Sequence, residues 1–109
     1  MSFELIATPN FQKEFKRLYK KYPSIPSDIA LITKTILVDP TNGSEVFKNC
    51  YKLRFAIKSK GKGKSGGGRL IVYVQITNER IYLLTIFDKS EKENVTDAYL
   101  KQLMKGLLP

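Results

Sequence analysis

The sequence contains no histidine and a single cysteine, Cys50. The absence of His excludes His-based acid–base catalysis, His-containing triads and His-ligated zinc. One cysteine cannot close a disulfide within the chain, which fits a reducing compartment. No apolar run approaches the roughly 20 residues that a membrane-spanning helix needs, and residues 1–11 do not follow the pattern of a secretory signal. We therefore expect a cytoplasmic protein without a membrane partner.

Acidic residues are missing from one long segment. The chain of 109 residues has 19 Lys and Arg against 10 Asp and Glu, a net charge of +9. Between Val46 and Asn78 there are eight basic residues and no acidic one. Solubility does not require one sign of charge to be concentrated, because concentration stores repulsion. The segment also lacks the amphipathic helical pattern of a membrane-surface element, so it favours nucleic acid as the polyanion partner.

The length and the hydrophobic content bound the architecture. A chain of 109 residues with 42% hydrophobic residues has the size and core of one compact domain. We therefore expect one domain over residues 1–109. Separate cofactor and substrate modules are excluded.

The first third of the chain predicts a strand and two helices. Residues 3–7 form a short apolar run, and Thr8 with Pro9 is typical of a helix start. This helix should continue to about Tyr22, since apolar residues recur at helical spacing. Ser24 opens a second helix that ends at Asp39 and whose core stripe is Ile25, Ile29, Ile32 and Ile36. The short break between the two helices predicts an antiparallel hairpin.

The period then changes from 3.6 to 2. In residues 51–58 the odd positions are apolar and the even positions are mostly basic, which predicts a strand with one core face and one cationic face. In residues 69–76 the predicted core positions are Leu70, Val72, Val74 and Ile76, which leaves Arg69 and Tyr73 on the opposite face. Residues 80–87 are apolar on both faces and predict a central strand, and residues 96–107 predict a last helix.

The predicted element order is β-α-α-β-β-β-α. Consecutive hairpins join the last three strands, so the sheet should be small and mainly antiparallel. The fold class is α+β, with the helical hairpin and the C-terminal helix packed on the sheet.

The glycine- and lysine-rich segment 58–69 resembles a phosphate loop but lacks its spacing. Gly63-Lys64-Ser65 is present, whereas the glycine required five residues earlier is replaced by Lys58. Two interpretations stay open: a long flexible hairpin, or a mobile cationic arm. In either case we expect the lysines of this segment to grip RNA backbone phosphates. They are Lys58, Lys60, Lys62 and Lys64.

The same segment lacks the clustered carboxylates that hold Mg²⁺ in metal-dependent nucleases, so we expect no metal and no cofactor. RNA carries its own nucleophile, the 2′-hydroxyl, and its cleavage needs only a base, an acid and a positive charge near the phosphate. Lys52, Arg54, Arg69 and Tyr73 are predicted to project from one side of neighbouring strands. Arginine suits the phosphate, a lysine crowded by like charges is a candidate base, and tyrosine a candidate acid. We expect Arg69 to be an exposed residue whose replacement leaves the fold intact.

Four motifs together resemble one known family. They are NFQKEFKRL, YKLR, SKGKGKSGGGRLIVY and IYLLTIFDKSEK. The chain is similar over its whole length to the RelE/ParE superfamily of bacterial toxins from toxin–antitoxin pairs, and most similar to its HigB-like branch. The resemblance implies a RelE-like fold and a metal-independent, ribosome-dependent endoribonuclease (mRNA interferase) that arrests growth.

The resemblance also assigns roles to residues. Lys52 and Arg54 match the basic pair on the second strand, Arg69 the arginine of the third strand, and Lys89 the cation after the last strand. Ribonuclease members often carry a tyrosine or histidine shortly after that cation, and residues 90–94 contain neither. Tyr73 or an acidic residue such as Glu91 would have to act in its place.

Two functions of different classes therefore remain. The first is an endoribonuclease toxin acting on mRNA at the ribosome. The second is a non-catalytic toxin of the ParE kind, which inhibits DNA gyrase. In both cases the resemblance implies an antitoxin partner. We expect it to be acidic and partly disordered, because a surface of this charge would otherwise bind RNA indiscriminately. A helix-turn-helix in the antitoxin is a further expectation from the resemblance.

Overall fold

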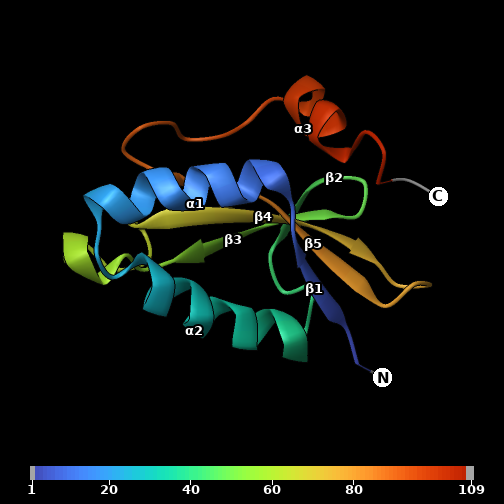
Figure 1. The fold of residues 1–109 in the computed structure, drawn as a ribbon, viewed down its shortest axis with the longest axis horizontal. Helices are drawn as coiled ribbons and strands as arrows, with labels where there is room; N and C mark the ends of the chain where they lie inside the picture. The colour runs from blue at the N-terminus through green and yellow to red at the C-terminus, as the bar shows by residue number, and fades with distance from the viewer. Residues whose placement is uncertain (1, 108–109) are drawn as a thin grey trace.

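The computed structural model describes residues 2–107 (Figure 1). Its five strands form one mixed sheet in the order β1-β5-β4-β3-β2, in which β1 runs parallel to β5 and the other pairs are antiparallel. The α+β class and the predicted element order are confirmed, with a short additional strand, β2. The elements are β1 (Glu4–Ala7), α1 (Pro9–Lys21), α2 (Ile25–Val38), β2 (Ser44–Phe47), β3 (Cys50–Phe55), the 3-10 turn η1 (Lys58–Lys60), β4 (Gly68–Gln75), β5 (Arg80–Asp88) and α3 (Asp97–Met104).

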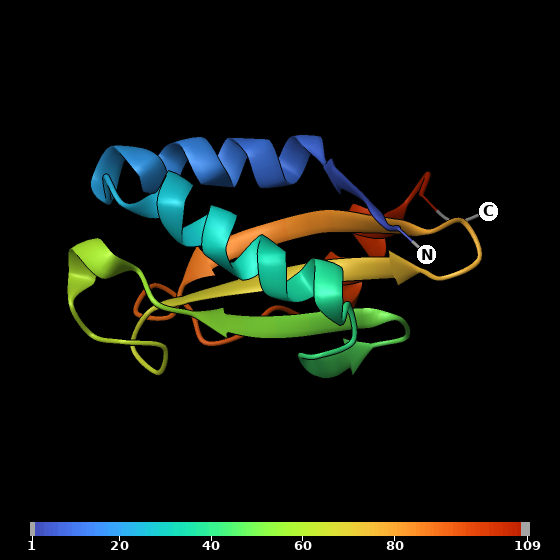
Figure 2. The same cartoon turned by 90° about the horizontal axis from the view of Figure 1, so that it is seen from below.

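The helices α1 and α2 form a hairpin on one face of the sheet (Figure 2). Thr8 caps α1, since its Oγ1 accepts a hydrogen bond from the backbone N–H of Phe11, as the sequence predicts. The predicted stripe of α2 packs into the core, although Ile32 is only partly buried. Within residues 2–107 no helix is both long and apolar enough to cross a membrane.

The helix α3 lies on the opposite face of the sheet (Figure 2). A second hydrophobic core lies beneath it. Tyr73 of β4 and Tyr82 of β5 stack there with ring centroids 5.9 Å apart, beside Cys50 and Met104. From the sequence we expected this face to be available to RNA. In the structure α3 covers the half of the face that contains Tyr73. The other half, toward Arg54 and Arg69, is where the candidate site lies.

Two predicted strand ends are wrong by a few residues. Ile76 was predicted to be core but is 54% exposed, because β4 ends at Gln75 and the chain turns there toward β5. The strand predicted over residues 51–58 ends at Phe55, and the chain enters η1 at Lys58. The last helix also ends early, at Met104, where Gly106 adopts a positive φ of 87°.

The strand β5 contains a bulge that α1 recognises. The register between β4 and β5 shifts between Ile71 and Val72, opposite Leu84. Asn10 Nδ2 donates a hydrogen bond to the Leu84 carbonyl at 3.0 Å, and Thr8 Oγ1 donates to the Leu83 carbonyl at 2.8 Å. The start of α1 is therefore fixed on the bulge.

The base of the loop between η1 and β4 is tightly packed. A Cβ atom on Gly68 would lie 2.2 Å from the Phe55 ring, and one on Gly67 would lie 2.3 Å from the Phe55 carbonyl oxygen. Glycine is therefore required at both positions because the loop returns directly against β3. A Cβ on Gly61 or Gly63 would meet nothing within 4 Å, so only the tip projects freely. This packing contradicts the interpretation of the whole segment as a mobile arm.

Candidate nucleic-acid interface

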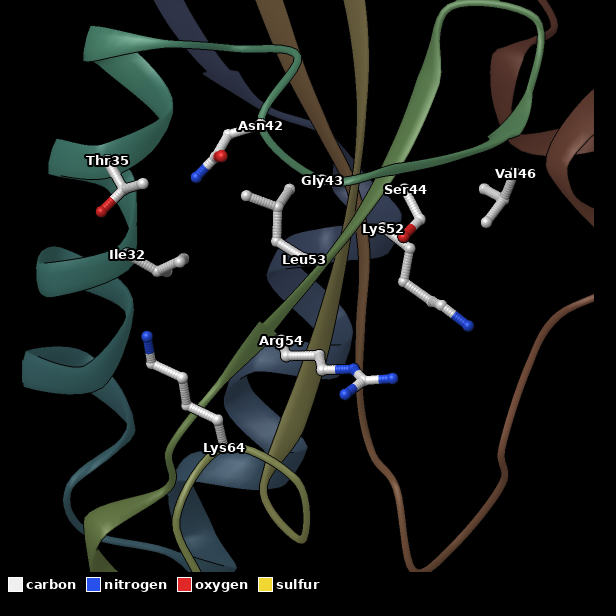
Figure 3. Close-up of a pocket in the computed structure, with 10 residues that line it drawn as sticks. All are labelled: Ile32, Thr35, Asn42, Gly43, Ser44, Val46, Lys52, Leu53, Arg54 and Lys64. Carbon is white, nitrogen blue, oxygen red and sulfur yellow. The ribbon is translucent and has the colours of Figure 1, made fainter.

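Three cationic side chains come together on the sheet face that carries α3, in the half of that face that α3 leaves uncovered. Arg54 of β3 lies directly opposite Arg69 of β4, and Lys52 lies two residues from Arg54 on the same face. Figure 3 shows the Lys52 and Arg54 side chains extending to the same side of β3. Among the residues that the structure describes, no ion pair involves any of the three. The structure therefore brings together the predicted Lys52, Arg54 and Arg69.

Arg69 differs from its prediction because it is only 4% exposed. Its Nη1 donates hydrogen bonds to the carbonyls of Lys64 (3.0 Å) and Gly68 (2.9 Å), and its Nη2 donates to Ser65 (3.0 Å). Burial, and then the charge of Arg54, hold the pKa of Arg69 below its ordinary value. The expectation of an exposed Arg69 was wrong. Arg69 fixes the loop before β4 and adds positive charge behind Arg54.

Lys60 also differs from its prediction as an RNA-binding residue. Its Nζ lies 2.6 Å from Asp88 Oδ1, in a buried ion pair that joins η1 to the end of β5. The same carboxylate accepts hydrogen bonds from the Tyr22 hydroxyl (2.6 Å) and from the backbone N–H and the hydroxyl of Ser90. Lys60 is therefore a structural residue that is not available to RNA.

The sequence suggested Tyr73 or Glu91 as the proton donor, and neither side chain is available for proton transfer on the cationic face. Tyr73 is buried under α3 and lies opposite Cys50, four residues along β4 from Arg69. Glu91 accepts hydrogen bonds through both carboxylate oxygens from Arg17, each at 3.0 Å, and this contact lowers the pKa of Glu91. Glu91 is therefore held as a carboxylate beside α1, so it is not a proton donor.

The remaining predicted cations are on the surface. Lys58, Lys62, Lys64 and Lys89 are all exposed. The backbone N–H of Lys89 donates to the Gly67 carbonyl at 3.1 Å, which places the start of the loop after β5 against the base of the lysine-rich loop. Their side chains are free to approach a polyanion.

A cation and two aromatic rings that the sequence interpretation missed adjoin the site. Phe87 of β5 lies directly opposite Arg69, and Lys92 Nζ lies 5.2 Å from the centre of its ring. The same Nζ lies 5.3 Å from the ring centre of Tyr99, which is partly exposed in the first turn of α3. The Tyr99 hydroxyl reaches Asn10 Oδ1 at 3.4 Å. The helical spacing of Tyr99 with Leu103 predicted a core residue. No local feature of the sequence indicated that Tyr99 would lie beside the site.

The comparisons with known proteins agree with this geometry. Residues 11–106 match the family described as the RelE toxin of the RelE/RelB toxin–antitoxin system. The chain belongs to the RelE toxin family. As a RelE-family toxin it has a cognate antitoxin as its partner.

Solved structures of RelE toxins share the fold at low identity. The E. coli toxin RelE, in a mutant form in the free state, superposes with a TM-score of 0.65 at 15% identity, over 99% of this chain and 100% of that chain. The isolated E. coli RelE toxin gives a TM-score of 0.59 at 17% identity with the same coverage. At this identity the superpositions establish the RelE fold.

Proposed function

We propose that this RelE-family toxin cleaves mRNA on the ribosome without a metal ion. The observation that supports the proposal is the register of β3 and β4, which sets Arg54 directly opposite Arg69 with Lys52 on the same face. Positive charge without carboxylate partners among residues 2–107 is suited to an RNA phosphate.

The proposed chemistry assigns one task to each side chain. Arg54, which is exposed, binds the scissile phosphate and neutralises the charge that grows on it, while buried Arg69 adds positive charge from behind. Lys52 in its amine form takes the proton of the 2′-hydroxyl, whose oxygen then attacks the adjacent phosphorus. The bond to the 5′-oxygen breaks, and a proton donor on the protein protonates that oxygen.

For the proton donor we propose Tyr99 in place of Tyr73. It lies on the side of the sheet that carries the cationic face, linked to Phe87 through Lys92. Lys89 stays a proposed further cation, and Lys58, Lys62 and Lys64 are proposed RNA contacts. Three further proposals come from the sequence. They are a single domain over residues 1–109, membership of the HigB-like branch, and an acidic antitoxin with a helix-turn-helix.

One observation favours the second candidate, a ParE-like inhibitor of DNA gyrase. Tyr73 is buried and Glu91 is bonded to Arg17, so neither acid predicted from the sequence is available for proton transfer. Such a toxin would need only the cationic surface, and no proton donor.

The decisive experiment combines purified toxin with ribosomes carrying a defined mRNA, and maps the new RNA ends. We expect cleavage by the wild type, loss of cleavage in Arg54→Ala, and full cleavage in Lys105→Ala, an exposed lysine outside the site. Intact mRNA together with gyrase-dependent DNA breaks would reject the ribonuclease and support the gyrase inhibitor.

A further inference from the structure

A cleft of about 420 Å³ lies between α2 and the edge of β3 (Figure 3). It forms because the pairing of β2 with β3 stops at Ser44 and Lys52, which leaves Leu53–Phe55 without a strand neighbour on that edge within residues 2–107. The cleft is lined by Ile32 and Thr35 of α2, by the segment 42–44, and by Leu53, Arg54 and Lys64. Its volume is within the range of small-molecule sites, which is about 300 to 1,000 Å³.

The polar side chains that line the cleft are not used by the fold. Thr35, Asn42 and Ser44 make no side-chain hydrogen bond to any described residue, whereas neighbouring hydroxyls do: Thr33 donates to Ala30 and Thr41 to Asp39. The two hydroxyls and one amide of the cleft therefore keep their full capacity for a ligand. Uncharged groups of this kind match the edges of nucleobases.

The floor of the cleft is apolar and continues beyond it. Ile32 and Leu53 point into the cleft in Figure 3. A smaller hollow of about 130 Å³ adjoins it and shares Ile32, Thr35, Arg54 and Lys64, with Leu31 and Phe55 as further apolar lining. Asp28 also lines this hollow, and its carboxylate accepts hydrogen bonds from the Ser24 hydroxyl and the Lys58 backbone N–H. Leu31 is 59% exposed, so this part of α2 offers apolar surface on which a flat ring can pack.

Cations connect the cleft to the proposed phosphate site. Arg54 lines the cleft at the edge of β3, and its side chain extends to the cationic face, opposite Arg69. Figure 3 shows the Lys64 ammonium reaching across the cleft toward Ile32. A strand of RNA with a phosphate at Arg54 would therefore have an adjacent base within reach of the cleft.

We propose that this cleft is a nucleobase subsite, which holds a base of the substrate RNA next to the phosphate bound at Arg54. The inference rests on the proposed function for the identity of the RNA as substrate. RNA is favoured over a peptide because the charges on the rim are Lys52, Arg54 and Lys64, and the groups inside are uncharged donors and acceptors above an apolar floor. The subsite would give the toxin a base preference of its own.

The test uses 2′-O-methyl RNA trinucleotides, which bind but cannot be cleaved because the attacking hydroxyl is blocked. Four sequences that differ only in the central base are titrated into the protein, and the backbone amide NMR signals are followed. We expect the signals of residues 42–44 and 53–55 to shift, and the best and worst trinucleotide to differ about tenfold in affinity, or 1.4 kcal/mol.

Variants of α2 test whether trinucleotide binding depends on the cleft or on the exposed surface of this helix in general. Thr35→Phe fills the cleft and should weaken the best trinucleotide about tenfold, whereas Ala30→Phe, also exposed on α2 but outside the cleft, should not. Asn42→Ala, a loop variant that leaves α2 untouched, should reduce the difference between bases. Equal effects of the two phenylalanine variants, or unchanged binding in both Thr35→Phe and Asn42→Ala, would overturn the subsite.

Two other outcomes are distinguishable. If Thr35→Phe spares trinucleotide binding and weakens the antitoxin complex, the cleft belongs to a protein partner and the proposal is overturned. If mRNA on ribosomes stays intact while trinucleotide binding depends on Thr35, the proposed activity fails and the subsite stands.

Discussion

Lys60 and Asp88 form a buried ion pair, with 2.6 Å between Nζ and Oδ1 and with side chains that are 8% and 0% exposed. Removing one partner of a buried pair leaves the other charge without compensation, at a cost of about 3 to 5 kcal/mol. We expect Asp88→Asn to lower the free energy of unfolding by about 3 kcal/mol at pH 7, measured by urea denaturation. Lys62→Gln, in the same loop and exposed, is the matched control. Equal stability of the two variants would contradict this.

The lowered pKa of Asp88 predicts how the stability of the fold depends on pH. Burial alone would raise the pKa of Asp88, but the hydrogen bonds from Lys60, Tyr22 and Ser90 together hold that pKa well below its usual range. An unfolded aspartate has a pKa of about 3.9, so the contribution of Asp88 is fully present above about pH 5 and declines as the pH falls toward the folded pKa. The difference in unfolding free energy between wild type and Asp88→Asn should therefore shrink between pH 6 and pH 3.

Arg69→Ala should affect the fold as well as activity. The substitution removes three hydrogen bonds and leaves the carbonyls of Lys64, Ser65 and Gly68 without that partner. Bonds from a charged donor contribute about 1.5 to 3 kcal/mol each, and we expect a net loss of about 3 kcal/mol in the free energy of unfolding. Hydrogen exchange should also become faster in residues 62–67. Arg54→Ala, which is exposed, should change neither measurement.

Tyr99→Phe tests the proposed proton donor. The variant keeps the ring beneath Lys92 and removes only the hydroxyl, so cleavage of ribosome-bound mRNA should slow by about 10² to 10⁴-fold without a loss of stability. The control is Tyr73→Phe, which makes the same change in the core under α3. A similar slowing in both variants would remove Tyr99 from the reaction.

The Arg17–Glu91 contact should contribute little to stability although it is bidentate. Arg17 is 48% and Glu91 34% exposed, so solvent and salt screen their interaction. A double-mutant cycle with Arg17→Met and Glu91→Gln should give a coupling below about 1 kcal/mol, and it should decrease in 1 M NaCl. A coupling of several kcal/mol that salt does not change would contradict this view.

Cys50 should be chemically inert in the folded protein. Burial, and then the nearby Glu45 charge, raise the pKa of the Cys50 thiol to about 12, and its Sγ lies 3.3 Å from Met104 Sδ under α3. We expect no reaction with iodoacetamide at pH 8 by mass spectrometry, and rapid reaction in 8 M urea. Met104→Ala loosens the cover and should allow slow alkylation. Fast alkylation of the folded wild type would show that α3 does not cover the thiol.

The fold was predictable where the pattern and the local chemistry agreed. The periods of 3.6 and 2, with Thr8 before Pro9, place α1, α2, β3, β4 and β5 within a few residues of their observed bounds. The strand β2 was not predicted, because four residues that pair only with the start of β3 carry no alternation of their own. The second core was missed because the apolar side of α3 does not reveal which half of the sheet it covers.

The site could be predicted only as far as strand register allows. Alternation alone assigns Lys52 and Arg54 to one face, and hairpin pairing brings Arg69 to the same face, opposite Arg54. Strand alternation gives no information on burial. The sequence therefore could not distinguish Lys60 and Arg69, whose side chains are buried and hydrogen-bonded within the fold, from their exposed basic neighbours. Tyr99 was missed because its neighbours Phe87 and Lys92 come together only in three dimensions.

The contrast between the glycines of the lysine-rich loop has an evolutionary consequence. Gly67 and Gly68 tolerate no side chain against Phe55, whereas Gly61 and Gly63 face open space and are constrained only by their positive φ angles of 71° and 65°. We therefore expect the tip to accept insertions, deletions and changes of charge that the two anchor glycines would not accept. The loop tip can in this way come to contact a different target while the packing of the hydrophobic core stays unchanged.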